Sequence, residues 1–180
     1  KNNLIEDKKI CLDVITQLNK YFAGERRDFD LKLDKSVKYG MILKGTEFKK
    51  RIAEAYVLRK IVVYQGNEIL EKLQPFFYNV QLKTIGMIIQ NAEEQFDLVI
   101  SDHSYINCIL QFAVMVEHLH QGKSCQGVNT IDKIDNLEWD ITKYIVQGIQ
   151  NYFQIHISSE DENYVYINVV GLKYQNKRGD

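Results

Sequence analysis

The chain has 180 residues, one proline, ten glycines and 45% hydrophobic residues, which is enough for one domain of ordinary size, or a small domain with a companion piece, and for a real core. With 45% hydrophobic residues, 26% charged residues and no low-complexity run, the chain is not expected to be intrinsically disordered, and no apolar stretch approaches the roughly 18–20 residues of a membrane span. The net charge is −1, but residues 1–60 hold 15 Lys or Arg against 9 Asp or Glu. This basic segment is either a surface that touches polyanions or an ordinary solvated face.

Helical and β periodicities alternate in the first third of the chain. Apolar residues recur at helical spacing over about 6–23, and Gly24 follows as a stop signal. Apolar and charged residues then alternate in 28–33, and the apolar run 39–43 comes after a short polar link, which predicts a β-hairpin. Thr46 is a candidate N-cap for a basic helix over about 47–64.

The rest of the chain is predicted to be all helical. Pro75 interrupts it, so we expect a hinge over 65–79 and a helix over about 79–95. Ser101 or Asp102 is placed to cap the next helix, whose wide apolar face predicts burial in a bundle core.

Polar residues 121–136 form the longest predicted loop, and a further helix is expected over about 141–153. A last helix begins at Ser158 or Ser159 and runs to about 174, with Ser159 and Glu162 at capping-box spacing. The predicted fold class is therefore mainly α: a helical bundle of four or five helices, preceded by a basic helix and a β-hairpin.

Motifs of enzyme chemistry are absent from the sequence. It contains no phosphate-binding loop, nucleophile elbow, zinc-ligand spacing or HExxH, so we predict no enzyme, no metal and no cofactor. Cys11, Cys108 and Cys125 form no CxxC pair, which favours a reducing, cytoplasmic location. His118 and His120 point to different faces of a helix, so they are not expected to chelate one metal.

Two stretches of the chain each carry a distinctive order of residues. Residues 100–122 read ISDHSYINCILQFAVMVEHLHQG, with an Ile-Ser-Asp opening, an apolar run and a closing glycine. Residues 157–174 read ISSEDENYVYINVVGLKY, with Asp161, Tyr164, Gly171 and Lys173 in order. Both stretches resemble the PTS regulation domain, or PRD, the helical module of bacterial sugar-operon antiterminators and mannitol-type activators. The resemblance implies a PRD-like bundle over 79–176.

An upstream segment fits the same kind of regulator. Residues 29–51 resemble the connection between a helix-turn-helix domain and a first PRD, and residues 8–22 resemble a recognition helix. The resemblance implies that 1–45 is the remnant of a winged helix-turn-helix domain, that 46–78 are linker helices, and that the chain is a fragment. The implied phosphate contacts to DNA come from the basic residues Lys8, Lys9, Lys20, Arg26 and Arg27.

Phosphorylation of histidines regulates proteins of this kind. In the family, sugar-phosphotransferase proteins modify one histidine position in each of the two helices, which changes the dimer and gene expression. Alignment places Gln111 and Asn168 at those positions, and a carboxamide accepts no phosphoryl group. If the register is different, His103 or His118 is the alternative acceptor. The two amides are otherwise ordinary polar residues at a helix surface or interface.

Three functions are compared. The first is a cytoplasmic, DNA-binding transcriptional regulator or antiterminator-like protein of the mannitol-activator or Mga type. It pairs as a homodimer, has phosphotransferase-system proteins as candidate partners and has no membrane partner. The second is a helical dimerisation or protein-interaction module without DNA binding. The third is a helical enzyme or sensor, which requires a polar pocket with perturbed titratable groups. Aromatic residues are candidates for the pairing face or for the core: Trp139, Tyr164, Tyr166 and Tyr174.

Overall fold

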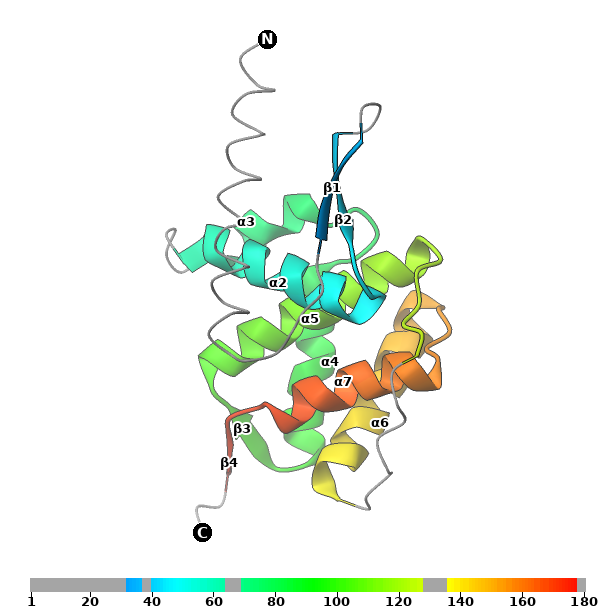
Figure 1. Cartoon of the computed structure of the whole chain (residues 1–180). Helices are drawn as coiled ribbons and strands as arrows, with labels where there is room; N and C mark the ends of the chain where they lie inside the picture. Colours follow the sequence, from blue (N-terminus) through cyan, green and yellow to red (C-terminus); the bar gives the residue numbers. More distant parts are fainter. Residues whose placement is uncertain (1–31, 37–39, 64–68, 128–135, 178–180) are drawn as a thin grey trace. The chain divides into compact units, whose positions relative to one another are not determined.

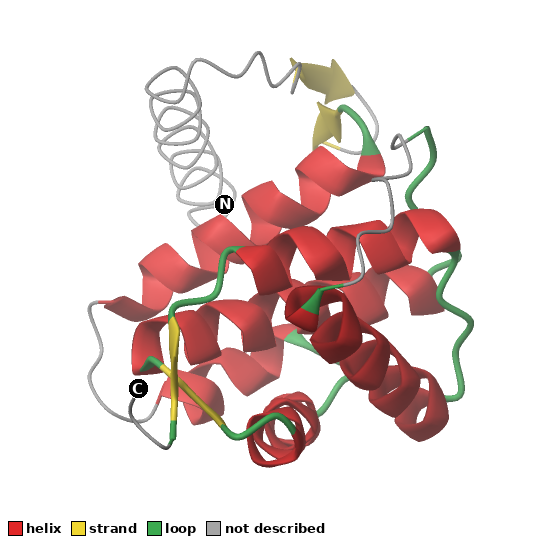
Figure 2. Ribbon diagram, turned by 90° about the horizontal axis from the view of Figure 1, so that it is seen from below, coloured by secondary structure: helices red, strands yellow, loops and turns green. Residues whose placement is uncertain are grey.

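The computed structural model describes residues 32–36, 40–63, 69–127 and 136–177. These ranges hold six α-helices, one 3₁₀ helix and four short strands (Figure 1). Figure 2 shows helix as the main secondary structure of the described part, as the predicted mainly α fold class requires. The chain divides into two compact units, Lys1–Ala53 and Glu54–Asp180. The helix predicted over 6–23 lies outside the described residues.

A hairpin precedes the start of α2 in the described part of the first unit. Strand β1 (Lys32–Ser36) pairs antiparallel with β2 (Gly40–Lys44), and Leu33 lies opposite Leu43. The predicted hairpin is therefore present, although its first strand extends to Ser36 and residues 28–31 lie outside the described ranges.

Helix α2 (Glu47–Val63) begins where the sequence places its cap. The Thr46 Oγ1 atom accepts a hydrogen bond from the Lys49 backbone N–H at 3.4 Å, and the Thr46 carbonyl accepts one from the Lys50 N–H at 3.1 Å. The Arg51 guanidinium then pairs with the Glu47 carboxylate at 3.3 Å, one turn apart on the same face. The predicted start of this helix is thus confirmed.

The second unit holds the carboxy-terminal part of α2 and the remaining helices. They are α3 (Ile69–Leu73), the 3₁₀ helix η1 (Gln74–Phe76), α4 (Leu82–Gln95), α5 (Asp102–His120), α6 (Leu137–Phe153) and α7 (Ser159–Val170). Helix α4 packs against α5 and α6, and α7 packs against the same two helices. The central core lies among these four helices, where Ile85, Phe112 and Ile149 are fully buried.

Helix α4 begins at Leu82, later than the predicted residue 79, because a side chain organises the preceding turn. Pro75 lies in the first turn of η1, where its missing N–H is not needed. The Gln74 amide donates to the Val80 carbonyl at 2.8 Å and accepts from the Leu82 N–H at 2.9 Å. These two hydrogen bonds give partners to the Val80 carbonyl and the Leu82 N–H, which have none within a helix.

The prediction that everything after Thr46 is helical is wrong at two places. Strand β3 (Leu98–Ile100) pairs antiparallel with β4 (Tyr174–Asn176), and helix α7 ends at Val170 instead of continuing to Tyr174. In β3, Leu98 and Ile100 are buried and Val99 is exposed, which is the alternation of a half-buried strand. The ladder ties the end of the chain to the connection between α4 and α5.

Candidate functional site

Gln111 lies in the buried middle of α5, and its side chain reaches across to α7. Its side-chain carbonyl accepts a hydrogen bond from the Tyr164 hydroxyl. Gln111 is 7% exposed and Tyr164 is completely buried. Because an unpaired polar group is costly in such a place, this contact fixes both side chains and joins the two helices.

Asn168 lies one helical turn after Tyr164 on α7. Its Nδ2 donates to the Tyr164 carbonyl at 2.9 Å, and the side chain is half-buried. The side chain of Tyr164 therefore contacts Gln111, while its backbone carbonyl contacts Asn168. We call these three residues the amide site.

The hydrogen bonds of the amide site fix its geometry, but the site offers no imidazole nucleophile. A carboxamide is neutral and acts as both a hydrogen-bond donor and an acceptor, whereas an imidazole nitrogen is nucleophilic near neutral pH. Gln111 and Asn168 therefore accept no phosphoryl group. Sequence reasoning missed the connecting role of Tyr164, although its position four residues before Asn168 places both on one face of the helix.

The alternative acceptor His118 is buried near the end of α5. Its Nε2 lies 2.7 Å from the Glu54 Oε2 atom on α2. A carboxylate in contact with the imidazole orients the ring and joins α5 to α2. The ring is therefore engaged in a helix-to-helix contact.

The other alternative, His103, is exposed in the first turn of α5 and contacts the Arg59 guanidinium of α2. Arg59 also donates to the Asn107 Oδ1 atom at 3.4 Å. His103 and His118 thus lie at opposite ends of the same helix and form separate contacts with α2. The structure does not bring them together.

The start of α7 is held by a buried carboxylate. Ser158 is the N-cap: its Oγ accepts from the Asp161 N–H at 3.1 Å and donates to Asp161 Oδ2 at 2.7 Å. The predicted capping box of Ser159 and Glu162 is therefore wrong, because the N-cap is Ser158 and its partner three residues later is Asp161.

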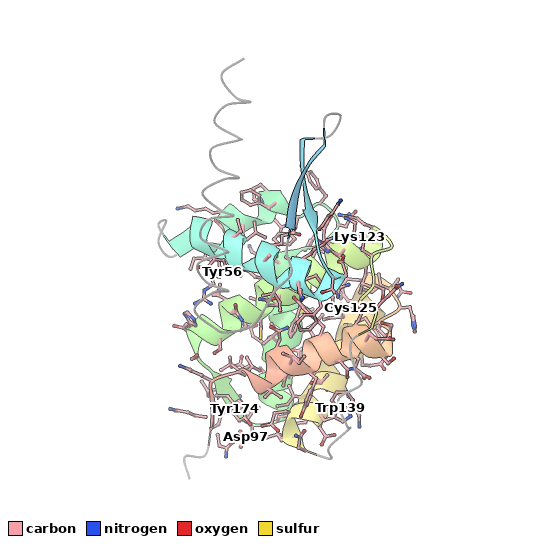
Figure 3. The ribbon with its side chains drawn as sticks, viewed as in Figure 1. Tyr56, Asp97, Lys123, Cys125, Trp139 and Tyr174 are labelled. Atoms are coloured by element: carbon pink, nitrogen blue, oxygen red, sulfur yellow. The ribbon has the colours of Figure 1, made fainter. Side chains whose placement is uncertain are left out.

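The same carboxylate also holds the segment that follows α5. Ser124 Oγ donates to Asp161 Oδ2, and the Cys125 N–H donates to Oδ1 at 3.0 Å. Figure 3 shows Cys125 beside the beginning of α7. Asp161 is completely buried, so these contacts supply the partners that a buried charge requires. Its role here is structural.

Most of the aromatic residues considered for a pairing face belong to the core. Trp139, Tyr164 and Tyr166 are all buried, and the Trp139 and Tyr166 rings meet edge to face at 4.9 Å between α6 and α7. Tyr174 is half-buried, and its hydroxyl donates to Glu138 at 3.0 Å. Burial, together with this hydrogen bond and the charge of Glu138, raises the pKa of Tyr174. Trp139, Tyr164 and Tyr166 therefore pack in the core, which is the second of the two roles considered for them.

A pocket of about 610 Å³ lies beside α3 and the start of α4. Its lining combines aliphatic residues, amides and Tyr78 with Glu71 and Lys83, and contains no histidine or cysteine. Among the described residues, no group of three or more His, Cys, Asp or Glu side chains is placed to hold a metal ion. Cys108 is fully buried, which raises the pKa of its thiol to about 12.

The five basic residues expected to contact DNA, Lys8, Lys9, Lys20, Arg26 and Arg27, lie outside the described residues. None of the helices that the structure does describe combines the length and apolar character needed to cross a bilayer.

A comparison with protein families bears on the bundle itself. Residues 86–172 match the family model described as the PRD domain. No curated protein matches the chain. The matched range includes α5 and α7, and hence all three residues of the amide site. The part of the sequence resemblance that concerns a PRD domain is therefore confirmed.

Proposed function

We propose that the PRD domain at residues 86–172 makes this chain the regulatory part of a cytoplasmic transcriptional regulator whose phosphohistidine positions have become amides. PRD domains are regulatory rather than catalytic, so the proposed role is to control a gene-expression module in response to other proteins. The mannitol-activator and Mga types are two regulator classes that share the plan suggested by the sequence pattern.

The observation that carries the proposal is the position of the amide site within the family match. Gln111 and Asn168 take the places where the resemblance expects histidines, and both contact Tyr164. An amide has a reach similar to that of an imidazole, so it can keep the local hydrogen bonds. A phosphohistidine would bring about two negative charges to the contact between α5 and α7. The amides keep that contact permanently neutral.

The consequence is a regulator fixed in its unphosphorylated arrangement. A switch requires a group whose charge or packing differs between two states. Gln111 and Asn168 provide no such difference, so the bundle responds to a bound partner or to its own pairing.

The amino-terminal part completes the proposed regulator. We assign residues 1–45 to the end of a winged helix-turn-helix domain, with linker helices over 46–78 and the PRD-like bundle over 79–176. The basic excess in 1–60 supports contacts with DNA phosphates. Binding to DNA requires the complete amino-terminal domain, and the regulator acts as a homodimer on two half-sites. The longer parent chain is expected to shift duplex DNA in a salt-dependent manner, whereas the present chain does so weakly.

The test restores a histidine at each position. The variants Gln111→His and Asn168→His, each in the full chain, are incubated with a phosphotransferase cascade, and phosphohistidine is mapped by mass spectrometry. Gln147→His is the matched control, because Gln147 is exposed on α6 away from the amide site. The proposal expects label at residue 111 or 168 in the variants and none in the control. Label on His103 or His118 of the natural chain, or on neither restored histidine, overturns it.

A further inference from the structure

The pocket beside α3 and the start of α4 has walls that are fixed by hydrogen bonds. We call it the α3–α4 pocket; its volume is about 610 Å³ and its lining comes from residues 70–83. The Gln74 amide fixes one wall, because it donates to the Val80 carbonyl at 2.8 Å and accepts from the Leu82 N–H at 2.9 Å. Val80 and Leu82 are themselves buried. The volume lies within the range of about 300–1,000 Å³ that small-molecule sites occupy.

A buried carboxylate of α5 fixes another part of the lining. Glu117 is buried, and its Oε1 atom accepts a hydrogen bond from the Asn79 Nδ2 at 2.8 Å. Its Oε2 atom accepts a second one from the Asn79 N–H at 3.1 Å. Asn79 is therefore held to α5 by two hydrogen bonds to one carboxylate. A ligand that enters a preformed site does not have to order the site, which lowers the entropic cost of binding.

Two opposite charges line the α3–α4 pocket. The Lys83 Nζ atom lies 3.9 Å from the Glu71 Oε1 atom, and both side chains are mostly exposed to solvent. The remaining lining residues carry no charge. An exposed ion pair of this kind contributes little to the stability of a fold. Glu71 and Lys83 can therefore exchange each other for the charges of a ligand at low cost.

We infer that the α3–α4 pocket binds a zwitterionic α-amino acid with an apolar side chain. A ligand with only a negative charge meets the like charge of Glu71, and a ligand with only a positive charge meets that of Lys83. A ligand with both charges avoids each repulsion, and such repulsion is what excludes the wrong ligands from a site. The ammonium and carboxylate of an α-amino acid are attached to one carbon atom, so they suit two protein charges that lie 3.9 Å apart.

Each part of the amino acid has a partner in the pocket. The Lys83 ammonium and the Gln81 amide donate to the ligand carboxylate; the Gln81 side chain does not cap α4. The Glu71 carboxylate accepts from the ligand ammonium. The apolar side chain lies against Leu70 and the ring of Tyr78, which is 91% exposed in the protein alone.

This inference goes beyond the proposed function and does not rest on it. Binding of an amino acid is measured without DNA and without phosphoryl transfer, so the failure of one proposal leaves the other standing. Glu117 connects the pocket to α5, the helix that also carries Gln111. Occupation of the pocket is thus a stimulus that requires no phosphohistidine.

Three related compounds test whether the pocket recognises both charges. The full chain is titrated with L-phenylalanine, with 2-phenylethylamine, which lacks the carboxylate, and with 3-phenylpropionate, which lacks the ammonium. Two-dimensional ¹H–¹⁵N correlation spectra follow each titration. We expect L-phenylalanine to shift the backbone amide signals of residues 78–83. Its dissociation constant is expected to be at least about tenfold lower than that of either analogue.

Two variants assign the charges to their partners. Lys83→Met is expected to bring the dissociation constant of L-phenylalanine to within about threefold of that of 2-phenylethylamine, because the carboxylate has lost its partner. Glu71→Gln is expected to do the same relative to 3-phenylpropionate. Both residues are exposed, so the signals outside the pocket report that the fold is retained. Lys143→Met, at an exposed position of α6, is the matched control and is expected to leave all three constants unchanged.

Three outcomes overturn the inference. The first is an absence of shifts at residues 78–83 up to the solubility limit of L-phenylalanine. The second is binding of either analogue as tightly as L-phenylalanine, which would show that the pocket reads one charge or the apolar ring alone. The third is a control variant, Lys143→Met, that weakens binding as much as Lys83→Met does.

Discussion

Removing one oxygen atom from Tyr164 tests the hydrogen bond that joins α5 to α7. In Tyr164→Phe the ring stays in place, but the Gln111 carbonyl loses the hydroxyl that donates to it. Tyr164 is 0% exposed and Gln111 is 7% exposed, so water does not readily replace the missing donor. A net hydrogen bond contributes about 1 kcal/mol, and a buried unsatisfied acceptor costs about 1–3 kcal/mol. We expect a loss of about 2 kcal/mol in the free energy of unfolding.

Removing the acceptor, instead of the donor, completes a double-mutant cycle. Gln111→Met keeps the length of the side chain and leaves the Tyr164 hydroxyl without its acceptor, which also costs about 2 kcal/mol. The double variant has no unsatisfied partner at this contact, so its loss is expected to be smaller than the sum of the two by at least about 1 kcal/mol.

Urea unfolding measures the cycle, with the single tryptophan as the probe. Trp139 is 3% exposed and contacts the Tyr166 ring, so its fluorescence reports on packing between α6 and α7. For a slope of about 1–3 kcal/mol per molar urea, each single variant lowers the midpoint by about 1 M. Tyr152→Phe makes the same chemical change at an exposed position and is expected to stay within about 0.5 kcal/mol of the natural chain. If the two single losses sum to within about 0.5 kcal/mol of the loss in the double variant, the buried hydrogen bond is refuted.

Further predictions concern the start of α7 and the buried thiol. Asp161→Ala leaves several donors unpaired and is expected to cost about 3–5 kcal/mol in urea unfolding; a loss below 1 kcal/mol would contradict the buried network. Ser158→Ala removes the N-cap and costs about 1 kcal/mol, whereas Ser159→Ala changes stability by less than about 0.5 kcal/mol, and equal effects would reverse the cap assignment. Burial raises the folded pKa of Cys108 from the ordinary 9.0 to about 12, so its contribution to stability is complete below pH 9 and is lost progressively as the pH rises from there to 12. The free energy of unfolding of Cys108→Ala should not show this loss between pH 9 and 12. A pH profile identical to that of the natural chain would contradict the prediction.

Local signals in the sequence predicted the helices whose ends are capped by their own side chains. The starts of α2 and α5 follow from Thr46 and Ser101, because a hydroxyl that accepts a backbone N–H acts within a single turn. The sequence left the start of α7 open between Ser158 and Ser159, because each serine is followed three residues later by an acidic residue. Burial of Asp161 against Ser124 decides between them, and that contact is not local.

Elements that depend on distant partners could not be predicted. Strands β3 and β4 have three residues each and pair across α5, α6 and α7, so neither has a pattern long enough to recognise. The amide site was predicted only through the family resemblance, because a glutamine and an asparagine on separate helices have no motif of their own. Their connection through Tyr164 requires the packing of α5 on α7.

The most direct test of the central claim is phosphoryl transfer to the natural chain beside its Gln111→His variant, in one cascade reaction with mass-spectrometric mapping. The account predicts an unmodified natural chain and phosphohistidine at position 111 of the variant. Modification of His103 or His118 in the natural chain would contradict it.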